Sequence, residues 1–155
     1  MATFIVEGGH SLKGELNPQG AKNEALQVIC ATLLTEEDVT IKNIPEIRDV
    51  LKLIDMLKEL GVEVSRIAKG EYVFNAKNIN PDFLKTERYT KLAASLRGSI
   101  MILGPMLARF GKGFIPQPGG DKIGRRRLDT HFIGFQNLGA KFIFNSHEKY
   151  YEISA

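Results

Sequence analysis

The stretch PGGDKIGRRRLDTH, residues 118–131, places one carboxylate just before a run of three arginines. The glycines at 119–120 let the main chain approach a ligand closely. The arginines at 125–127 are permanently charged, and their guanidinium groups match the oxygen geometry of phosphate and carboxylate. A turn needs the glycines but not the arginines, and a nucleic-acid patch needs the arginines but not Asp121. The stretch therefore indicates either a small-anion site beside an acidic group or an exposed basic loop.

Two further cationic positions are suited to binding an anion. Lys22 and Asn23 follow the turn sequence NPQGA and open a mostly apolar segment, and a helix start exposes free N–H groups that attract anions. Arg97 interrupts another apolar segment, where a charged side chain needs a partner. The simpler alternatives are a solvated lysine beside a capping asparagine, and an arginine that extends to the surface.

These positions fall within a pattern that occurs twice. Residues 22–41 and 97–116 align at an offset of 75, and each predicts a mostly apolar helix followed by a short strand. Residues 46–64 and 127–144 each predict an amphipathic helix that stops at the glycine of an LG pair and leads into a hairpin. The expected core positions are 47, 50, 51, 54, 57 and 60 in the first of these helices, and Leu128, Phe132, Phe135 and Leu138 in the second.

Each copy thus reads helix, strand, helix and hairpin, which predicts an α/β (α+β) fold built from βαβαββ-like units. Alternation of helices and strands favours parallel connections, so we expect mixed sheets. Asp129 is expected to begin its helix as a cap, and His131 to support the neighbouring loop.

Composition excludes several classes of protein. The net charge of +3, from 21 basic and 18 acidic residues, is too balanced to require a nucleic-acid partner. The apolar run 98–108 is too short to span a bilayer, no secretory signal is visible, and the single Cys30 cannot form an internal disulfide. Metal, hydrolase and P-loop patterns are missing from the sequence. We expect a cytoplasmic protein without metal or cofactor.

Three motifs together resemble one family. GAKNEAL (20–26), SLRGSIMILGPMLARFG (95–111) and PGGDKIGRRRLDTH, in this order and spacing, are similar to the UDP-N-acetylglucosamine 1-carboxyvinyltransferases. The related enzyme of the shikimate pathway shares the fold but is not expected to carry both GAKN and PGG-x-x-IG-x-R. The resemblance implies the inside-out α/β barrel of the enolpyruvyl transferases, with about two of its βαβαββ units present.

The resemblance also implies a reaction, which begins bacterial peptidoglycan synthesis. The enolpyruvyl group of phosphoenolpyruvate moves to the 3′-hydroxyl of UDP-N-acetylglucosamine by addition and elimination, and phosphate is released. Lys22 would contact phosphoenolpyruvate as a catalytic residue, Asn23 would lie beside both substrates, and Arg97 would reach the nucleotide sugar or help to close the site. The remaining substrate-binding positions implied by the motif are Arg126, Arg127, Leu128, Asp129 and Thr130.

Asp121 takes the position of the family's catalytic loop acid, in a loop spanning 116–128. Most members have cysteine there and a minority have aspartate, so the resemblance implies fosfomycin resistance for the parent enzyme. An aspartic acid donates a proton only if its pKa is raised. Neighbouring arginines lower the pKa and an anionic substrate raises it, so the sequence leaves the balance open.

The length of the chain departs from the family pattern of two domains with three units each. The resemblance divides the chain into opening strands at 1–20 that pack with the second domain, a first unit at 21–77, a linker at 78–89 and a second unit at 90–155. We therefore expect a truncated part of the enzyme, inactive alone and prone to self-associate through uncovered strand edges. The alternatives are a non-catalytic module that binds phosphate or a nucleotide sugar, and a basic RNA-binding domain, which lacks interleaved aromatic residues.

Overall fold

The structure is a computed structural model, and it describes residues 3–116, 127–146 and 150–155. The first half of the chain contains α1 (Lys22–Ala31), the 3-10 helix η1 (Thr32–Leu34), β1 (Val39–Ile41), α2 (Arg48–Leu60), β2 (Glu63–Ala68) and β3 (Glu71–Asn75). The second half contains η2 (Pro81–Lys85), α3 (Glu87–Ala94), η3 (Arg97–Ile102), α4 (Leu103–Phe110), β4 (Lys112–Pro116), α5 (Asp129–Asn137), β5 (Lys141–Asn145) and β6 (Tyr150–Ser154). The predicted order of helix, strand, helix and hairpin therefore occurs twice.

Each half forms its own three-stranded sheet, with the orders β1-β3-β2 and β4-β6-β5. Every neighbouring pair of strands is antiparallel, so the expectation of mixed sheets was wrong. The reason is the place of the hairpin's second strand. Because β1 and β2 both run antiparallel to β3, they point the same way across α2, as a helical crossover favours, but β3 lies between them.

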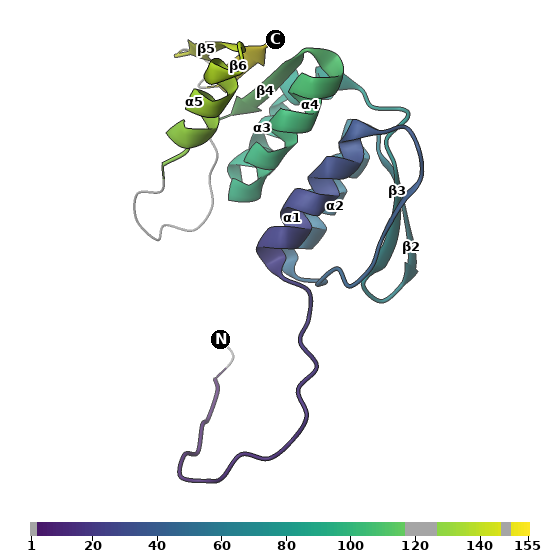
Figure 1. Cartoon of the computed structure of the whole chain (residues 1–155), viewed down its shortest axis with the longest axis vertical. Helices are drawn as coiled ribbons and strands as arrows, with labels where there is room; N and C mark the ends of the chain where they lie inside the picture. The colour runs from purple at the N-terminus through teal and green to yellow at the C-terminus, as the bar shows by residue number, and fades with distance from the viewer. Residues whose placement is uncertain (1–2, 117–126, 147–149) are drawn as a thin grey trace.

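Helices α1 to α4 lie side by side between the two sheets, and α5 lies beside β5 and β6 (Figure 1). In α2 the buried residues are Val50, Leu53, Ile54, Met56, Leu57 and Leu60. Two predicted core positions, Ile47 and Leu51, are more than a third exposed, because the buried stripe is centred on the 53/57/60 side of the helix. The predicted stop is confirmed, since Gly61 adopts a left-handed φ of 108° at the end of α2.

Helix α5 is the most exposed helix described, and none of its residues is buried. Leu128, Phe132 and Phe135 pack on a small second core beside β4 and β6, as predicted. Leu138 was predicted on the same face but is 86% exposed, because α5 ends at Asn137 and the chain turns before it reaches that position.

Arg109 joins the two halves. Its guanidinium, in a side chain that is only 15% exposed, donates through Nη1 to the carbonyl oxygens of Leu33 (3.1 Å) and Ala76 (2.7 Å) and through Nη2 to Glu36 (2.8 Å).

The stretch 78–89, expected as a linker, contains η2 and the start of α3 and buries Leu84 and Tyr89.

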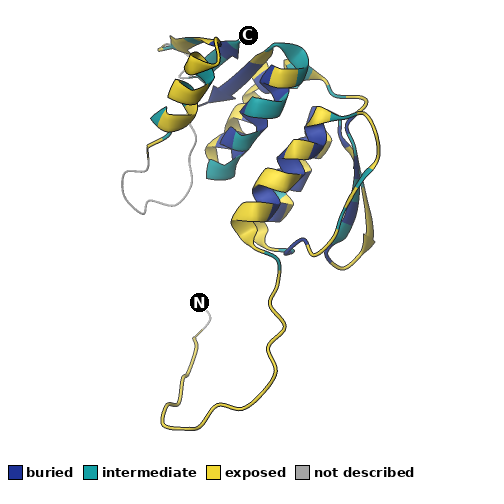
Figure 2. Cartoon of the chain, in the orientation of Figure 1, coloured by how far each residue is buried: buried dark blue, intermediate teal, exposed yellow. Residues whose placement is uncertain are grey.

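Residues 3–20 contain no helix or strand and extend away from the rest of the chain (Figures 1 and 2). Phe4, Ile5 and Val6 are 88–91% exposed. The opening strand expected here is therefore not formed in this structure, because a strand needs a hydrogen-bonded neighbour and no described strand pairs with this segment. Within the described parts of the chain, no helix has both the length and the apolar character needed to cross a membrane.

Candidate functional site

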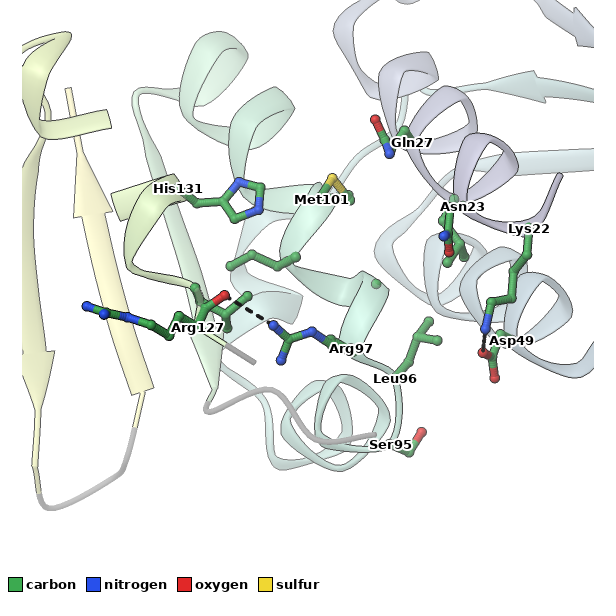
Figure 3. A pocket seen from close by; sticks show the side chains of 14 residues that line it. Lys22, Asn23, Gln27, Asp49, Ser95, Leu96, Arg97, Met101, Arg127 and His131 are labelled. Carbon is green, nitrogen blue, oxygen red and sulfur yellow. Dashed lines mark hydrogen bonds and ion pairs between the residues drawn. The ribbon is translucent and has the colours of Figure 1, made fainter. Parts of the chain in front are cut away.

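A pocket of about 350 Å³ opens between the start of α1, the start of η3 and the residues that lead into α5. Its wall contains three cationic residues, Lys22, Arg97 and Arg127, and one carboxylate, Asp49 (Figure 3). The other lining residues are Asn23, Leu26, Gln27, Ser95, Leu96, Gly98, Ile100, Met101, Leu128 and His131. Charge of this sign beside neutral polar groups suits a small anion that carries phosphate or carboxylate.

The ends of two helical segments bring the motif residues together. Lys22 and Asn23 are the first residues of α1, and Arg97 is the first residue of η3 rather than an interruption within a longer helix. Gly98 lets these segments pack closely, because a Cβ there would lie 2.9 Å from Cδ1 of Leu26. The structure therefore places Arg97 on the same pocket as Lys22 and Asn23, which lie about 75 positions earlier in the sequence.

Lys22 is held by an ion pair with the next helix. Its Nζ donates to Oδ2 of Asp49, in the first turn of α2, at 3.0 Å. Both side chains are partly exposed at the pocket wall. Sequence reasoning missed Asp49, since an acidic residue in the first turn of a helix is common for reasons of helix stability alone.

On the opposite wall, Arg97 contacts the residues before α5. Its Nη2 donates to the main-chain oxygen of Arg127 at 3.2 Å, and the Arg127 guanidinium turns away from Lys22 (Figure 3). That guanidinium forms a fork with Asp129, with Nε 3.1 Å from Oδ1 and Nη2 2.5 Å from Oδ2. The predicted capping role of Asp129 was wrong, because α5 begins at Asp129 itself and has no side-chain cap.

The motif positions therefore divide into three groups. Lys22, Asn23, Arg97, Arg127 and Leu128 line the pocket. Asp129 and Thr130 are at the start of α5 and are not among its lining residues. Asp121 and Arg126, which the resemblance assigns to catalysis and to substrate binding, lie outside the described residues.

Besides Asp49, three further polar lining residues were not identified as ligand-binding positions from the sequence. Gln27 follows Asn23 by one helical turn, so the i, i+4 spacing was an available signal. His131, expected only to support the loop, lines the pocket. Ser95 had no comparable signal; its hydroxyl donates to the carbonyl oxygen of Leu92 at 2.8 Å.

Comparison with known proteins finds curated relatives along the whole chain. The chain is 58% identical over its whole length to UDP-N-acetylglucosamine 1-carboxyvinyltransferase of Bacteroides fragilis and 52% identical to that of Porphyromonas gingivalis. In both cases it covers 36% of the relative. The chain thus spans about a third of the length of these curated relatives.

Two solved structures share the fold. The enolpyruvyl transferase NikO from Streptomyces tendae has a TM-score of 0.72 at 18% identity, and the match covers 96% of this chain and 31% of that one. EPSP synthase from Acinetobacter baumannii has a TM-score of 0.52 at 12% identity, with 91% and 32% covered. These likenesses confirm the predicted fold class.

One family model spans almost the whole sequence. The model for EPSP synthase (3-phosphoshikimate 1-carboxyvinyltransferase) matches residues 6–155, a range that includes all three motifs and every described pocket residue. On this match, together with the shared fold, the chain belongs to the EPSP synthase family.

Proposed function

We propose that this chain is part of an enzyme that transfers the enolpyruvyl group of phosphoenolpyruvate to the 3′-hydroxyl of UDP-N-acetylglucosamine and releases phosphate. The observation that carries the proposal is the convergence of Lys22, Asn23 and Arg97 on one pocket. The identity of 58% over every residue with transferases of that name supports the same conclusion.

The charges of the pocket fit the first substrate. Phosphoenolpyruvate carries a phosphate and a carboxylate, and the pocket offers the ammonium of Lys22 and the guanidinium of Arg97. Cations fixed in place before the reaction stabilise the charge that develops on these groups, and they hold the two reactants in the orientation that the reaction needs. Asn23 adds a neutral amide able to donate to one substrate and accept from the other.

The proton for the vinyl carbon is assigned to Asp121 on the motif alone. Addition of the sugar hydroxyl needs an acid at this carbon, and elimination of phosphate needs a base that removes a proton from the methyl group formed there. Since Asp121 lies outside the described residues, its role rests on its place in the PGGDKIG motif.

We propose UDP-N-acetylglucosamine as the acceptor rather than 3-phosphoshikimate. The matching family model is named after EPSP synthase, the enzyme of the shikimate pathway. The relatives with 46–58% identity are instead named UDP-N-acetylglucosamine 1-carboxyvinyltransferase. The reaction would then serve peptidoglycan synthesis, and thereby cell shape and division, in the cytoplasm.

The chain alone is expected to show no turnover, because it spans only about a third of the length of its relatives. Uncovered apolar residues such as Phe4 and Ile5 also favour self-association. Sedimentation of the chain over a range of concentrations tests this expectation, and a strict monomer throughout would contradict it.

Binding experiments with the full-length gene product that carries this sequence test the proposed function. UDP-N-acetylglucosamine, phosphoenolpyruvate and a single-stranded RNA are titrated at two salt concentrations. We expect both substrates to bind, and we expect Lys22→Met to weaken the binding of phosphoenolpyruvate. The matched control is Lys58→Met, which replaces an exposed lysine on α2. Salt-sensitive binding of RNA alone would contradict the proposal, and binding of the nucleotide sugar without phosphate release would favour the non-catalytic module.

A further inference from the structure

We infer that Asp49 is a positioning residue for the anion site, whose carboxylate holds the ammonium of Lys22 at the pocket wall while leaving its other N–H donors for the ligand. The inference rests on the proposed function, since it assumes that the pocket of Lys22 and Arg97 binds an anionic substrate. It assigns a role to a residue that none of the three motifs contains.

The geometry leaves Lys22 available to a ligand. An ammonium has three N–H donors, and the contact with Asp49 is a single hydrogen bond of 3.0 Å from Nζ to Oδ2. The pair joins α1 to α2 across 27 residues of sequence. In Figure 3 the side chain of Lys22 extends from α1 toward Asp49 and ends beside the space that separates it from Arg97.

Helix electrostatics explain why this lysine needs a partner. Lys22 is the first residue of α1, where the positive end of the helix dipole repels a cation. A lysine side chain is long and flexible, so an unpaired ammonium at this place gains by turning into solvent. Asp49 is in the first turn of α2, where a carboxylate is favoured, and it supplies the attraction that keeps Lys22 at the wall. Glu24 is also in the first turn of α1, but it lines a different pocket.

Stability alone does not account for the pair. The side chains of Lys22 and Asp49 are 46% and 38% exposed, and ion pairs this exposed contribute little to the free energy of unfolding. A carboxylate in the wall of an anion site also repels the ligand. Charge alone therefore predicts that removing Asp49 tightens anion binding, whereas a positioning role predicts that it weakens binding. The sign of the effect separates the two accounts.

The test is a double-mutant cycle on anion affinity in the full-length gene product. Phosphoenolpyruvate, and separately inorganic phosphate, are titrated without the nucleotide sugar, so that no turnover consumes the ligand. We expect Asp49→Ala to raise the Kd for phosphoenolpyruvate by about tenfold. In a Lys22→Met background the same change should not weaken binding further, because the residue that Asp49 positions is gone. A merely structural role would weaken binding equally in both backgrounds.

The matched control is Asp55→Ala, which removes a 68% exposed carboxylate from the same helix and should leave the Kd unchanged. If Asp49→Ala unfolds, Asp49→Asn keeps the size of the side chain and one acceptor oxygen, and its affinity should fall between wild type and Lys22→Met. Tighter or unchanged binding in the Asp49 variants, or equal weakening in the Lys22→Met background, overturns the inference. If the wild-type protein binds neither anion, the proposed function of the pocket fails first.

Discussion

The guanidinium of Arg97 donates through Nη2 to the main-chain oxygen of Arg127, 30 residues further along the chain, at 3.2 Å. This hydrogen bond ties the first residue of η3 to the segment that enters α5, so two walls of the pocket are fixed to each other. A guanidinium has five N–H donors. Arg97 therefore combines a permanent positive charge at the pocket wall with a hydrogen bond that holds the segment before α5.

Replacement of Arg97 by lysine should separate charge from geometry. Arg97→Lys keeps the positive charge but removes the planar set of donors, so it cannot hold the Arg127 carbonyl and a substrate in the same way. We expect kcat/KM of the full-length gene product to fall about tenfold or more. Arg88→Lys, an exposed arginine that pairs with Glu59, serves as the control. Equal kcat/KM values for Arg97→Lys and Arg88→Lys would contradict a substrate-binding role for Arg97.

Stability in acid should depend on Glu46. Its carboxylate accepts hydrogen bonds from Arg66, from the Gly70 N–H and from the Tyr72 hydroxyl, and these lower its pKa from the usual 4.5 to about 2. Because the folded-state pKa is the lower one, Glu46 stabilises the fold above about pH 4.5, and this contribution is lost as the pH falls toward 2. Thermal unfolding of Glu46→Gln between pH 2 and 5 should therefore show a weaker pH dependence than wild type.

The control for this experiment is Glu15→Gln, in the exposed segment before α1. Its unfolding curve should follow that of the wild-type protein across the same pH range. A Glu46→Gln variant with the full wild-type pH dependence would show that the network around Glu46 does not stabilise the fold.

The entry into α1 depends on Gly20. A Cβ at this position would overlap the main-chain oxygen of Asn43, which itself has a left-handed φ of 58°. Main chain cannot yield as a flexible side chain does, so Gly20→Ala should destabilise the protein by about 1–3 kcal/mol. Gly134→Ala, on α5 with no atom within 4 Å of the added Cβ, should be neutral or slightly stabilising. Equal denaturant midpoints for the two variants would contradict this reading of Gly20.

Asp121 provides a test of the loop acid that the motif implies. Asp121→Asn keeps the shape of the side chain and removes the proton, so turnover should fall on the order of 100-fold or more. Asp121→Cys should keep activity and gain time-dependent inactivation by fosfomycin, because a thiolate attacks an epoxide far more readily than a carboxylate does. Normal turnover by Asp121→Asn would assign the acid to another residue.

The site residues that the sequence predicted are those at the starts of elements. Lys22 and Asn23 could be predicted at a helix start because a turn signal precedes an apolar run. The end of α2 could be predicted because Gly61 follows a segment with amphipathic periodicity. Both signals come from residues that are neighbours in the sequence. Local structure predicted from such signals is found in the folded protein where tertiary packing favours the same structure.

The features that the sequence did not predict depend on long-range packing. The insertion of β3 between β1 and β2 is a choice of sheet order that no single strand specifies. Asp49 resembles any first-turn carboxylate until α1 and α2 are placed side by side. Leu138 fits the helical period of α5 but falls beyond the last helical residue, and helix ends are less well specified than helix interiors.

The choice of acceptor tests the central claim most directly. Phosphate release is measured for the full-length gene product with phosphoenolpyruvate and either UDP-N-acetylglucosamine or 3-phosphoshikimate, with Lys22→Met as the site control. The proposed function predicts sustained release with UDP-N-acetylglucosamine, none above background with 3-phosphoshikimate, and loss of the activity in Lys22→Met. Release with 3-phosphoshikimate alone, or activity with the nucleotide sugar that survives Lys22→Met unchanged, would contradict it.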